Sequence, residues 1–286
     1  MISPEKVLAQ VKVLPTLSAA SMRLAELARD PRSGAADFEK VIRPDPALTA
    51  NLLRVSNSAY FGLRGRVESV RQAITLLGLK RVSEVAAAAA LGPVIPARLP
   101  GYEVEASTFW LHSVAVAVLA ERLAEELGMK RPELTFTAGL LHDVGKLAVC
   151  AFVAVEAVPI LEAVRGGLAF VAAERAVLGI DHGELGGKVA EAWSLPAAVA
   201  DAARWHHEPA GAPATVDRVL VDLVHAADAL AHALGLGTDA GELARTVDGE
   251  VEERLGVTAR RLEHVAGESL DQISELARLF APGGKP

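Results

Sequence analysis

Apolar residues along this chain recur with the spacing of helices rather than of strands. Residues 215–234 repeat apolar positions every three to four residues and stop at Gly235-Leu236-Gly237. No run alternates apolar and polar residues in the way that is typical of a half-buried strand. Ala, Leu and Val dominate, and Ala and Leu have high intrinsic helix propensity. The pattern therefore predicts an all-α fold.

Capping residues mark where several helices begin. Asp45 followed by Pro46 predicts an N-cap and a first-turn proline that open a helix over residues 47–55. Ser69 predicts the start of a helix over residues 70–77, which Gly78 could close in a left-handed C-cap. Ser3 with Pro4 predicts another helix start.

Proline and glycine clusters suggest how the chain is divided. Three prolines fall within the eight residues 93–100, which cannot continue a helix. Further breaks lie at residues 208–213 and 235–242, and we expect the tail 281–286 to fray. The predicted parts are an N-terminal helical lobe (1–100), a helical bundle (101–235) and a C-terminal extension (236–286).

Composition narrows the function classes. The net charge of -7 argues against bulk nucleic-acid binding. The single cysteine excludes an internal disulfide, and its apolar surroundings predict that Cys150 is a core thiol. The start of the chain shows no secretory signal, and the longest non-polar stretch, residues 85–97, is too short for a membrane span. We expect a cytoplasmic protein with no membrane partner.

Several histidines lie inside apolar helical patterns, where an imidazole needs a partner. His112 shares a helix stripe with Val116, Leu119 and Leu123. Imidazole and carboxylate together suit a divalent Mn, Fe, Co, Ni or Zn ion. The candidate metal ligands are His112, His142, Asp143, His182, His206, His207 and Asp228.

These ligands divide into two possible sets. One metal would take His112, His142, Asp143 and Asp228. A second would take the other three histidines and share Asp143 as a bridge. Two metals about 4 Å apart polarise a phosphoryl oxygen and supply a hydroxide. Lys146, three residues after Asp143, is the candidate catalytic residue that steadies the phosphate.

Structural interpretations stand beside these. Each histidine could instead be a hydrogen-bonded core residue, and Asp228 could pair with His232 four residues later. We interpret His225, His232 and His264 as surface or local hydrogen-bonding residues. The segment 57–71 has two interpretations. Asn57 could bond to backbone in a packed turn, which we favour, or Arg64 and Arg66 could grip a partner or nucleotide.

The order His112, His142-Asp143, Asp228 resembles the signature of HD-type metal-dependent phosphohydrolases. Further segments make the chain similar to the HDOD family, the HD-related output domain of bacterial signal transduction proteins, over roughly residues 10–235. They are Val13–Leu17, Val41–Thr49, Leu52–Gly62, Gln72–Leu79, Trp110–Ser113, Gly139–Lys146 and Trp193–Pro196. The resemblance implies an HD-like helical bundle preceded by an N-terminal helical lobe.

The resemblance also implies a function. HDOD domains are viewed as regulatory modules, so we expect a non-catalytic regulatory domain with a signalling protein partner and a pocket for a metal or a nucleotide ligand. The alternative is a metal-dependent phosphohydrolase that acts on a nucleotide or another phosphate ester. The chain departs from the HD-GYP phosphodiesterases, because no Gly-Tyr-Pro segment follows Glu208 and Thr108 stands where those enzymes can carry a glutamate ligand.

Overall fold

The computed structural model describes residues 3–15, 17–58, 61–63, 65–129, 134–238 and 245–279. Contacts divide the chain into two compact units. Unit 1 comprises Met1–Leu14 and Pro96–Leu270, and unit 2 comprises Pro15–Ile95 and Asp271–Pro286. The three-part division expected from the sequence stays a prediction.

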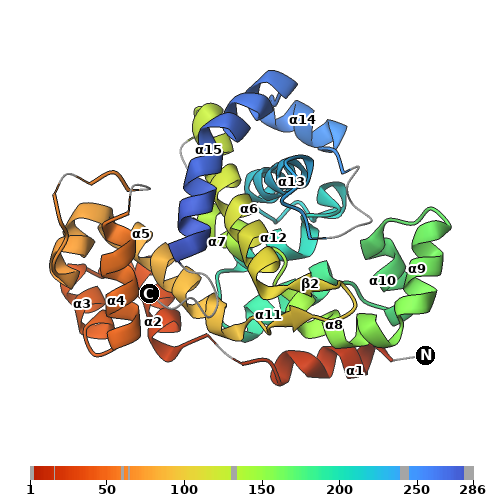
Figure 1. Cartoon of the computed structure of the whole chain (residues 1–286), viewed down its shortest axis with the longest axis horizontal. Coiled ribbons are helices and arrows are strands. Elements are labelled where there is room, and N and C mark those ends of the chain that lie inside the picture. Colours follow the sequence, from red (N-terminus) through yellow and green to blue (C-terminus); the bar gives the residue numbers. More distant parts are fainter. Residues whose placement is uncertain are drawn as a thin grey trace. The chain divides into compact units, whose positions relative to one another are not determined.

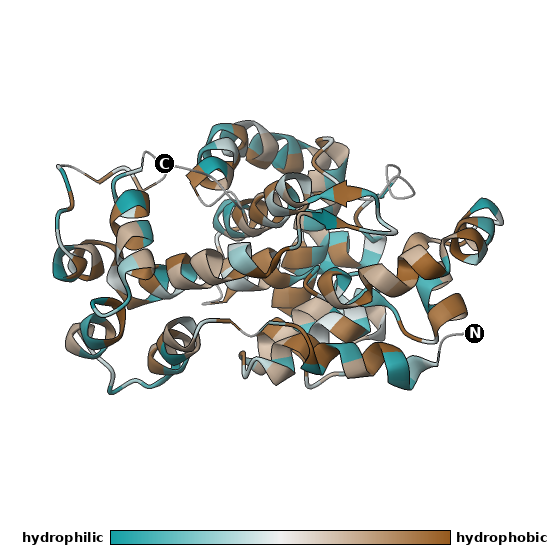
Figure 2. Ribbon diagram, turned by 60° about the horizontal axis from the view of Figure 1, so that its bottom comes forward, coloured by the Kyte–Doolittle hydropathy of each residue, from teal (hydrophilic) through white to brown (hydrophobic). Residues whose placement is uncertain are grey.

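The all-α fold is confirmed. Among the described residues, strand is limited to the antiparallel pair β1 (Arg98–Leu99) and β2 (Val104–Glu105). In Figure 2 the helices carry brown stretches next to teal ones, as expected of helices that bury one face.

Unit 2 is built around the long helix α5 (Val70–Leu91), against which the three preceding helices pack. They are α2 (Ala19–Arg29), α3 (Ala35–Ile42) and α4 (Pro46–Ser56), and the 3-10 turn η2 (Gly92–Val94) follows α5. The predicted N-caps are confirmed, because Asp45 accepts from the amide of Leu48 and Ser69 from that of Gln72.

The predicted left-handed cap at Gly78 is wrong in part. Gly78 has a positive φ of 80°, but its ψ of 163° is extended rather than left-handed helical. The chain kinks there and resumes the helix as far as Leu91, because the alanines after the kink bury themselves against the unit. The helix thus bends where the sequence predicted that it would end.

The side chain of Asn57, at the end of α4, makes hydrogen bonds to backbone groups on both sides of the turn. Its amide nitrogen donates to the carbonyls of Leu53 (2.7 Å) and Val67 (2.9 Å), and its oxygen accepts from the amide of Val67 (2.8 Å). These bonds agree with the structural interpretation of this segment. A surface cavity of about 820 Å³ adjoins it, with Arg66 in its lining, and Arg64 lies outside the described residues.

Unit 1 holds the remaining helices. At its start are α1 (Pro4–Ala9) and the 3-10 turn η1 (Gln10–Lys12). The bundle comprises α6 (Ala106–Glu126), α7 (Thr135–Leu141), α8 (Gly145–Val155), α9 (Ala157–Arg165), α10 (Phe170–Leu178), α11 (His182–Ala192), α12 (Ala197–Trp205), η3 (Pro209–Gly211) and α13 (Arg218–Ala233). Then come α14 (Gly249–Leu255) and α15 (Ala259–Leu279), of which the part up to Leu270 belongs to unit 1.

The bundle of unit 1 brings helices together that are distant in sequence. Helix α6 packs on α7 and α13, and α12 packs on α7, α11 and α13 (Figure 1). Helix α11 also packs on α8. Five of the predicted ligands lie at or just beyond helix ends of this bundle, whereas His112 lies within α6 and Asp228 within α13.

Two glycines allow the closest approaches. A Cβ on Gly139 would lie 2.7 Å from the Cα of Ala117, and a Cβ on Gly145 would lie 1.9 Å from the carbonyl oxygen of His182. Neither distance is compatible with a side chain. The two glycines therefore let α7 and α8 seat the turn between them deep in the bundle.

In the part of the chain that the structure describes, one stretch, Thr135–Val155, is long and apolar enough by composition to cross a membrane. However, 78% of its most apolar window is buried inside the protein, as in the core helices of a folded domain. Cys150 is buried on this stretch, and burial raises the pKa of its thiol, which agrees with a core thiol. Cytoplasmic location stays a prediction.

We expect Gly145→Ala to destabilise the protein by about 3 kcal/mol, because the new methyl group meets backbone atoms that cannot rotate away. Gly267→Ala is the matched control. It lies in α15, where an added Cβ would meet no neighbouring atom, so it should gain about 0.5–1 kcal/mol from helix propensity. Urea unfolding measures both, and equal stabilities for the two variants would contradict the packing argument.

Candidate metal centre

The seven predicted ligands converge inside the bundle of unit 1, although they are widely separated along the chain. His112 lies on α6, His142 and Asp143 in the turn between α7 and α8, and Asp228 on α13. His182 begins α11, while His206 and His207 follow α12. All except His207 are at most 1% exposed.

Ligand atoms form two compact groups. The first is His112, His142 and Asp228, and the second is Asp143, His182, His206 and His207. Within each group the atoms lie within 4.8 Å of one another. The histidines and Asp228 divide as the sequence predicted. Asp143 was expected to belong to both groups, and here it falls within the second.

Asp143 faces both groups. Its Oδ2 lies 3.5 Å from Nε2 of His112 and 3.5 Å from Nε2 of His142. Its Oδ1 lies 3.4 Å from Nε2 of His182 and 3.6 Å from Nε2 of His206. One carboxylate therefore presents one oxygen to each group, as a bridging ligand does.

Backbone carbonyls set the orientation of three imidazole rings. Nδ1 of His112 donates to the carbonyl of Leu236 (2.9 Å), and Nδ1 of His142 donates to that of Gly139 (2.7 Å). His206 does the same toward Ala203 (2.8 Å). A carbonyl oxygen only accepts, so the ring proton is on Nδ1 and Nε2 is left to bind a cation or a second proton.

Glu174 orients the fourth ring. Its Oε2 accepts from Nδ1 of His182 (2.7 Å) and from the backbone amide of the same residue (2.9 Å), and its Oε1 accepts from the hydroxyl of Tyr102. A carboxylate behind a ligand histidine fixes the ring and raises its basicity. Sequence reasoning missed Glu174. Its sequence offers little signal, because the neighbouring Arg175 makes Glu174 look like part of a solvated charged pair.

Two cations accompany the two aspartates. Nζ of Lys146 lies 2.8 Å from Oδ2 of Asp143 and donates to the hydroxyl of Thr238 (3.0 Å). NH1 of Arg245 lies 2.7 Å from Oδ2 of Asp228. Lys146 was predicted at this site, whereas Arg245 was missed, because nothing in the sequence around it marks a site.

These charges shift the pKa values. Burial alone would raise the pKa of Asp143. The nearby charges of Lys146 and His142 lower it by more than burial raises it, so the pKa of Asp143 lies well below its usual range. Arg245 has the same effect on the pKa of Asp228. Burial lowers the pKa of His112, yet Asp143 and Asp228 outweigh it and raise that pKa to about 9. Burial lowers the pKa of His206 to about 4.

The interpretation of the other histidines needs a correction. His225 and His232 are not on the surface: they are 5% and 3% exposed. Tertiary packing buries them because α13 lies in the middle of the bundle. His225 does make local hydrogen bonds, donating to the carbonyl of His206 (2.6 Å), and His232 lies 3.5 Å from Asp228. His264 is exposed, as predicted.

The donor set fits a divalent transition metal. Oδ1 of Asp143, Oδ1 of Asp228 and Nε2 of His206 are buried with no hydrogen bond, and the Oδ2 atoms of the two aspartates form ion pairs with Lys146 and Arg245. Nε2 of His112 and Nε2 of His142 lie 3.2 Å apart, and both rings use Nδ1 as the donor elsewhere. Two Nε2 lone pairs that face each other in this way favour a cation between the two rings.

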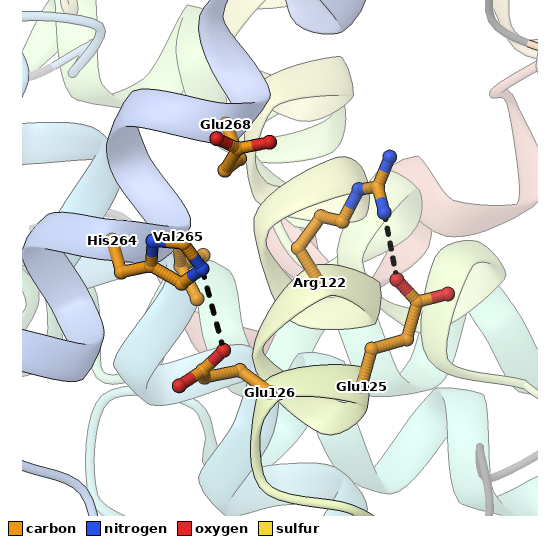
Figure 3. Close-up of a pocket in the computed structure, with 6 residues that line it drawn as sticks. All are labelled: Arg122, Glu125, Glu126, His264, Val265 and Glu268. Carbon is orange, nitrogen blue, oxygen red and sulfur yellow. Dashed lines mark hydrogen bonds and ion pairs between the residues drawn. The ribbon is translucent and has the colours of Figure 1, made fainter.

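A second cavity of about 240 Å³ lies between α6 and α15 and has a different character (Figure 3). Arg122 pairs with Glu125 at 2.9 Å, and Nε2 of His264 lies 3.7 Å from Glu126. Its charged groups are partly or largely exposed and pair with one another. This cavity lacks the converging buried side chains that characterise the His/Asp centre.

A helical bundle enclosing a His, His-Asp and Asp centre is the architecture of the HD class of domains. The family comparison is specific: the HDOD domain model matches residues 14–209, and the chain belongs to the HDOD domain family.

Solved structures have the same fold. A candidate phosphohydrolase from Shewanella amazonensis SB2B has a TM-score of 0.75 at 24% identity, covering 96% of this chain and 98% of that one. An HDOD domain protein of unknown function from Geobacter sulfurreducens has a TM-score of 0.73 at 24% identity, covering 96% and 97%.

A curated relative is an uncharacterised protein from Treponema pallidum (strain Nichols). It is 24% identical over 210 residues, which are 70% of this chain and 39% of the relative. The match therefore spans less than two thirds of that relative's length.

We expect Glu174→Gln to lower the free energy of unfolding by about 2 kcal/mol, because an amide cannot accept on both of its atoms and leaves a buried donor unpaired. Glu253→Gln, an exposed change on α14, is the control. Urea unfolding in the presence of a chelator measures both. A Glu174→Gln protein as stable as the control would show that Glu174 does not anchor His182.

Proposed function

We propose that this chain is a regulatory HDOD domain whose buried His/Asp centre binds a divalent transition metal. One observation carries the proposal: seven candidate ligand side chains converge, all except His207 are at most 1% exposed, and four of the five imidazole rings direct Nε2 toward the centre. A centre closed in this way suits a metal that sets the conformation of a bundle better than one that meets a free substrate.

The residues divide the work as follows. His112, His142 and Asp228 would hold one metal, and His182, His206 and His207 another, with Asp143 between them. The metal is Fe, Mn, Zn, Co or Ni, because imidazole and carboxylate suit these ions. Glu174 and the carbonyls behind the rings keep each Nε2 directed inward.

Regulation would act through a partner. Membership in the HDOD family supports a signalling protein as that partner and a cytoplasmic location. A nucleotide is a further candidate ligand, because Lys146 places a buried ammonium beside the shared carboxylate at 2.8 Å.

The second candidate is a metal-dependent phosphohydrolase. The bridging position of Asp143 favours it, because two-metal sites of this type polarise a phosphoryl oxygen and supply a hydroxide when loaded. Lys146 would then contact a phosphate oxygen. This activity requires the bundle to open, since Lys146 is 2% exposed.

Metal content tests the centre itself. We expect the purified protein, after incubation with Mn, Fe or Zn salts, to retain one to two equivalents by inductively coupled plasma mass spectrometry, and Asp143→Ala to retain far less because both groups lose a ligand. Asp271→Ala, an exposed aspartate on α15, should retain the wild-type amount. A wild-type protein free of metal would contradict the proposal.

Turnover separates the two candidates. We expect the metal-loaded protein to hydrolyse generic phosphomonoesters and phosphodiesters no faster than the equally loaded Lys146→Met variant, because the ammonium is already paired with the carboxylate of Asp143 at 2.8 Å. A metal-dependent rate at least tenfold above that of Lys146→Met would support the phosphohydrolase instead.

A further inference from the structure

Arg245 contacts both ligand groups with one guanidinium. Its NH1 lies 2.7 Å from Oδ2 of Asp228, a member of the first group, and its NH2 contacts Nδ1 of His207, a member of the second. The side chain is 11% exposed. A planar fork of donors can hold two acceptors at once, which a lysine ammonium cannot do with the same geometry.

The contact with His207 determines where that ring carries its proton. A guanidinium only donates, so Nδ1 of His207 accepts and the proton of the neutral ring is on Nε2. Nε2 of His207 lies 2.6 Å from Nε2 of His182. The lone pair that His182 would offer to a metal is therefore taken by His207, and Oδ2 of Asp228 is taken by Arg245.

Each of the two aspartates has its own cation beside it. Lys146 lies 2.8 Å from Asp143, and Arg245 lies 2.7 Å from Asp228. A divalent cation placed among the same carboxylates would lie close to both side-chain cations in a buried region, where Coulomb repulsion is strong. An anion that bonds to both side-chain cations would reduce that repulsion.

We propose that Arg245 is a displaceable internal cation that competes with the metal for Asp228 and His207, and that a phosphate-type anion relieves the competition by accepting from Arg245 and Lys146. The inference rests on the proposed metal centre. It makes metal binding and anion binding mutually reinforcing, with Arg245 as the residue through which each favours the other.

The segment after Arg245 is held to the bundle by bonds that do not involve the arginine side chain. The amide of Asp248 donates to Nε2 of His225 (3.0 Å), whose Nδ1 donates to His206. Arg254 on α14 makes two bonds to Asp222 on α13, at 2.8 and 2.9 Å. Because these bonds persist without the arginine side chain, the proposed displacement involves that side chain and leaves the rest of the segment in place.

The test is a titration of the full chain with Co²⁺, followed by calorimetry and by the visible absorption of the bound ion, with and without inorganic phosphate. We expect Arg245→Gln to bind Co²⁺ about tenfold more tightly than wild type without phosphate, which corresponds to the loss of one charge-assisted contact. Phosphate should tighten Co²⁺ binding by wild type by about the same factor and leave Arg245→Gln nearly unchanged.

Two further variants complete the design. Arg245→Lys keeps the charge but loses the fork, so its Co²⁺ affinity should lie between those of wild type and Arg245→Gln. Arg260→Gln, an exposed change on α15, should match wild type. Thermal unfolding of each protein shows that it is folded before the titration.

The outcomes are distinct. If wild type binds Co²⁺ and Asp143→Ala does not, but Arg245→Gln binds no more tightly than wild type, the role of Arg245 is overturned and the metal centre stands. The role of Arg245 is also overturned if phosphate tightens Co²⁺ binding equally in wild type and Arg245→Gln. If wild type binds no Co²⁺ under any condition, the metal centre is overturned, and the competition with it.

Discussion

The centre of this protein depends on a simple property of imidazole: a neutral ring has one donor and one acceptor. In three rings the donor is committed to a backbone carbonyl, and in a fourth to the carboxylate of Glu174. The ring atoms that remain all point toward Asp143 and Asp228, which are themselves acceptors. A buried cluster of acceptors needs cations to be stable, and the structure places Lys146 and Arg245 against the two carboxylates.

The fold brings five of the seven candidate ligands to the centre at helix ends. The turn that carries His142 and Asp143 lies where α7 and α8 come very close to α6 and α11, and Gly139 and Gly145 make that approach sterically possible. His182 begins one helix and His206 follows another, so backbone groups at helix ends lie beside the rings. The spacing between ligands along the chain therefore reflects helix lengths, and the groups meet only when the bundle packs.

Much of this could be predicted from sequence where the signal was local or ordered. Helical periodicity, the caps at Asp45 and Ser69, and the inward stripe of His112 are local, and the structure has them as predicted. Glu174 and Arg245 could not be found in this way, because each acts on a histidine that tertiary packing brings to it. His225 and His232 were predicted to lie on the surface because histidine is polar. They are buried because α13 lies in the middle of the bundle. At Gly78 the residue type indicated a break, but whether the helix stops or resumes depends on what packs beyond it.

The turn after α13 is held by the centre at two points. The carbonyl of Leu236 accepts from His112, and the hydroxyl of Thr238 accepts from Lys146. A bound ion that stiffens His112 therefore also stiffens this turn, and thermodynamic linkage makes the effect reciprocal. A protein that docked on the turn and preferred its present conformation would raise the affinity of the centre for its ion by the same factor by which the ion raised the affinity for that protein. The coupling free energy would thus have one value whichever site is filled first.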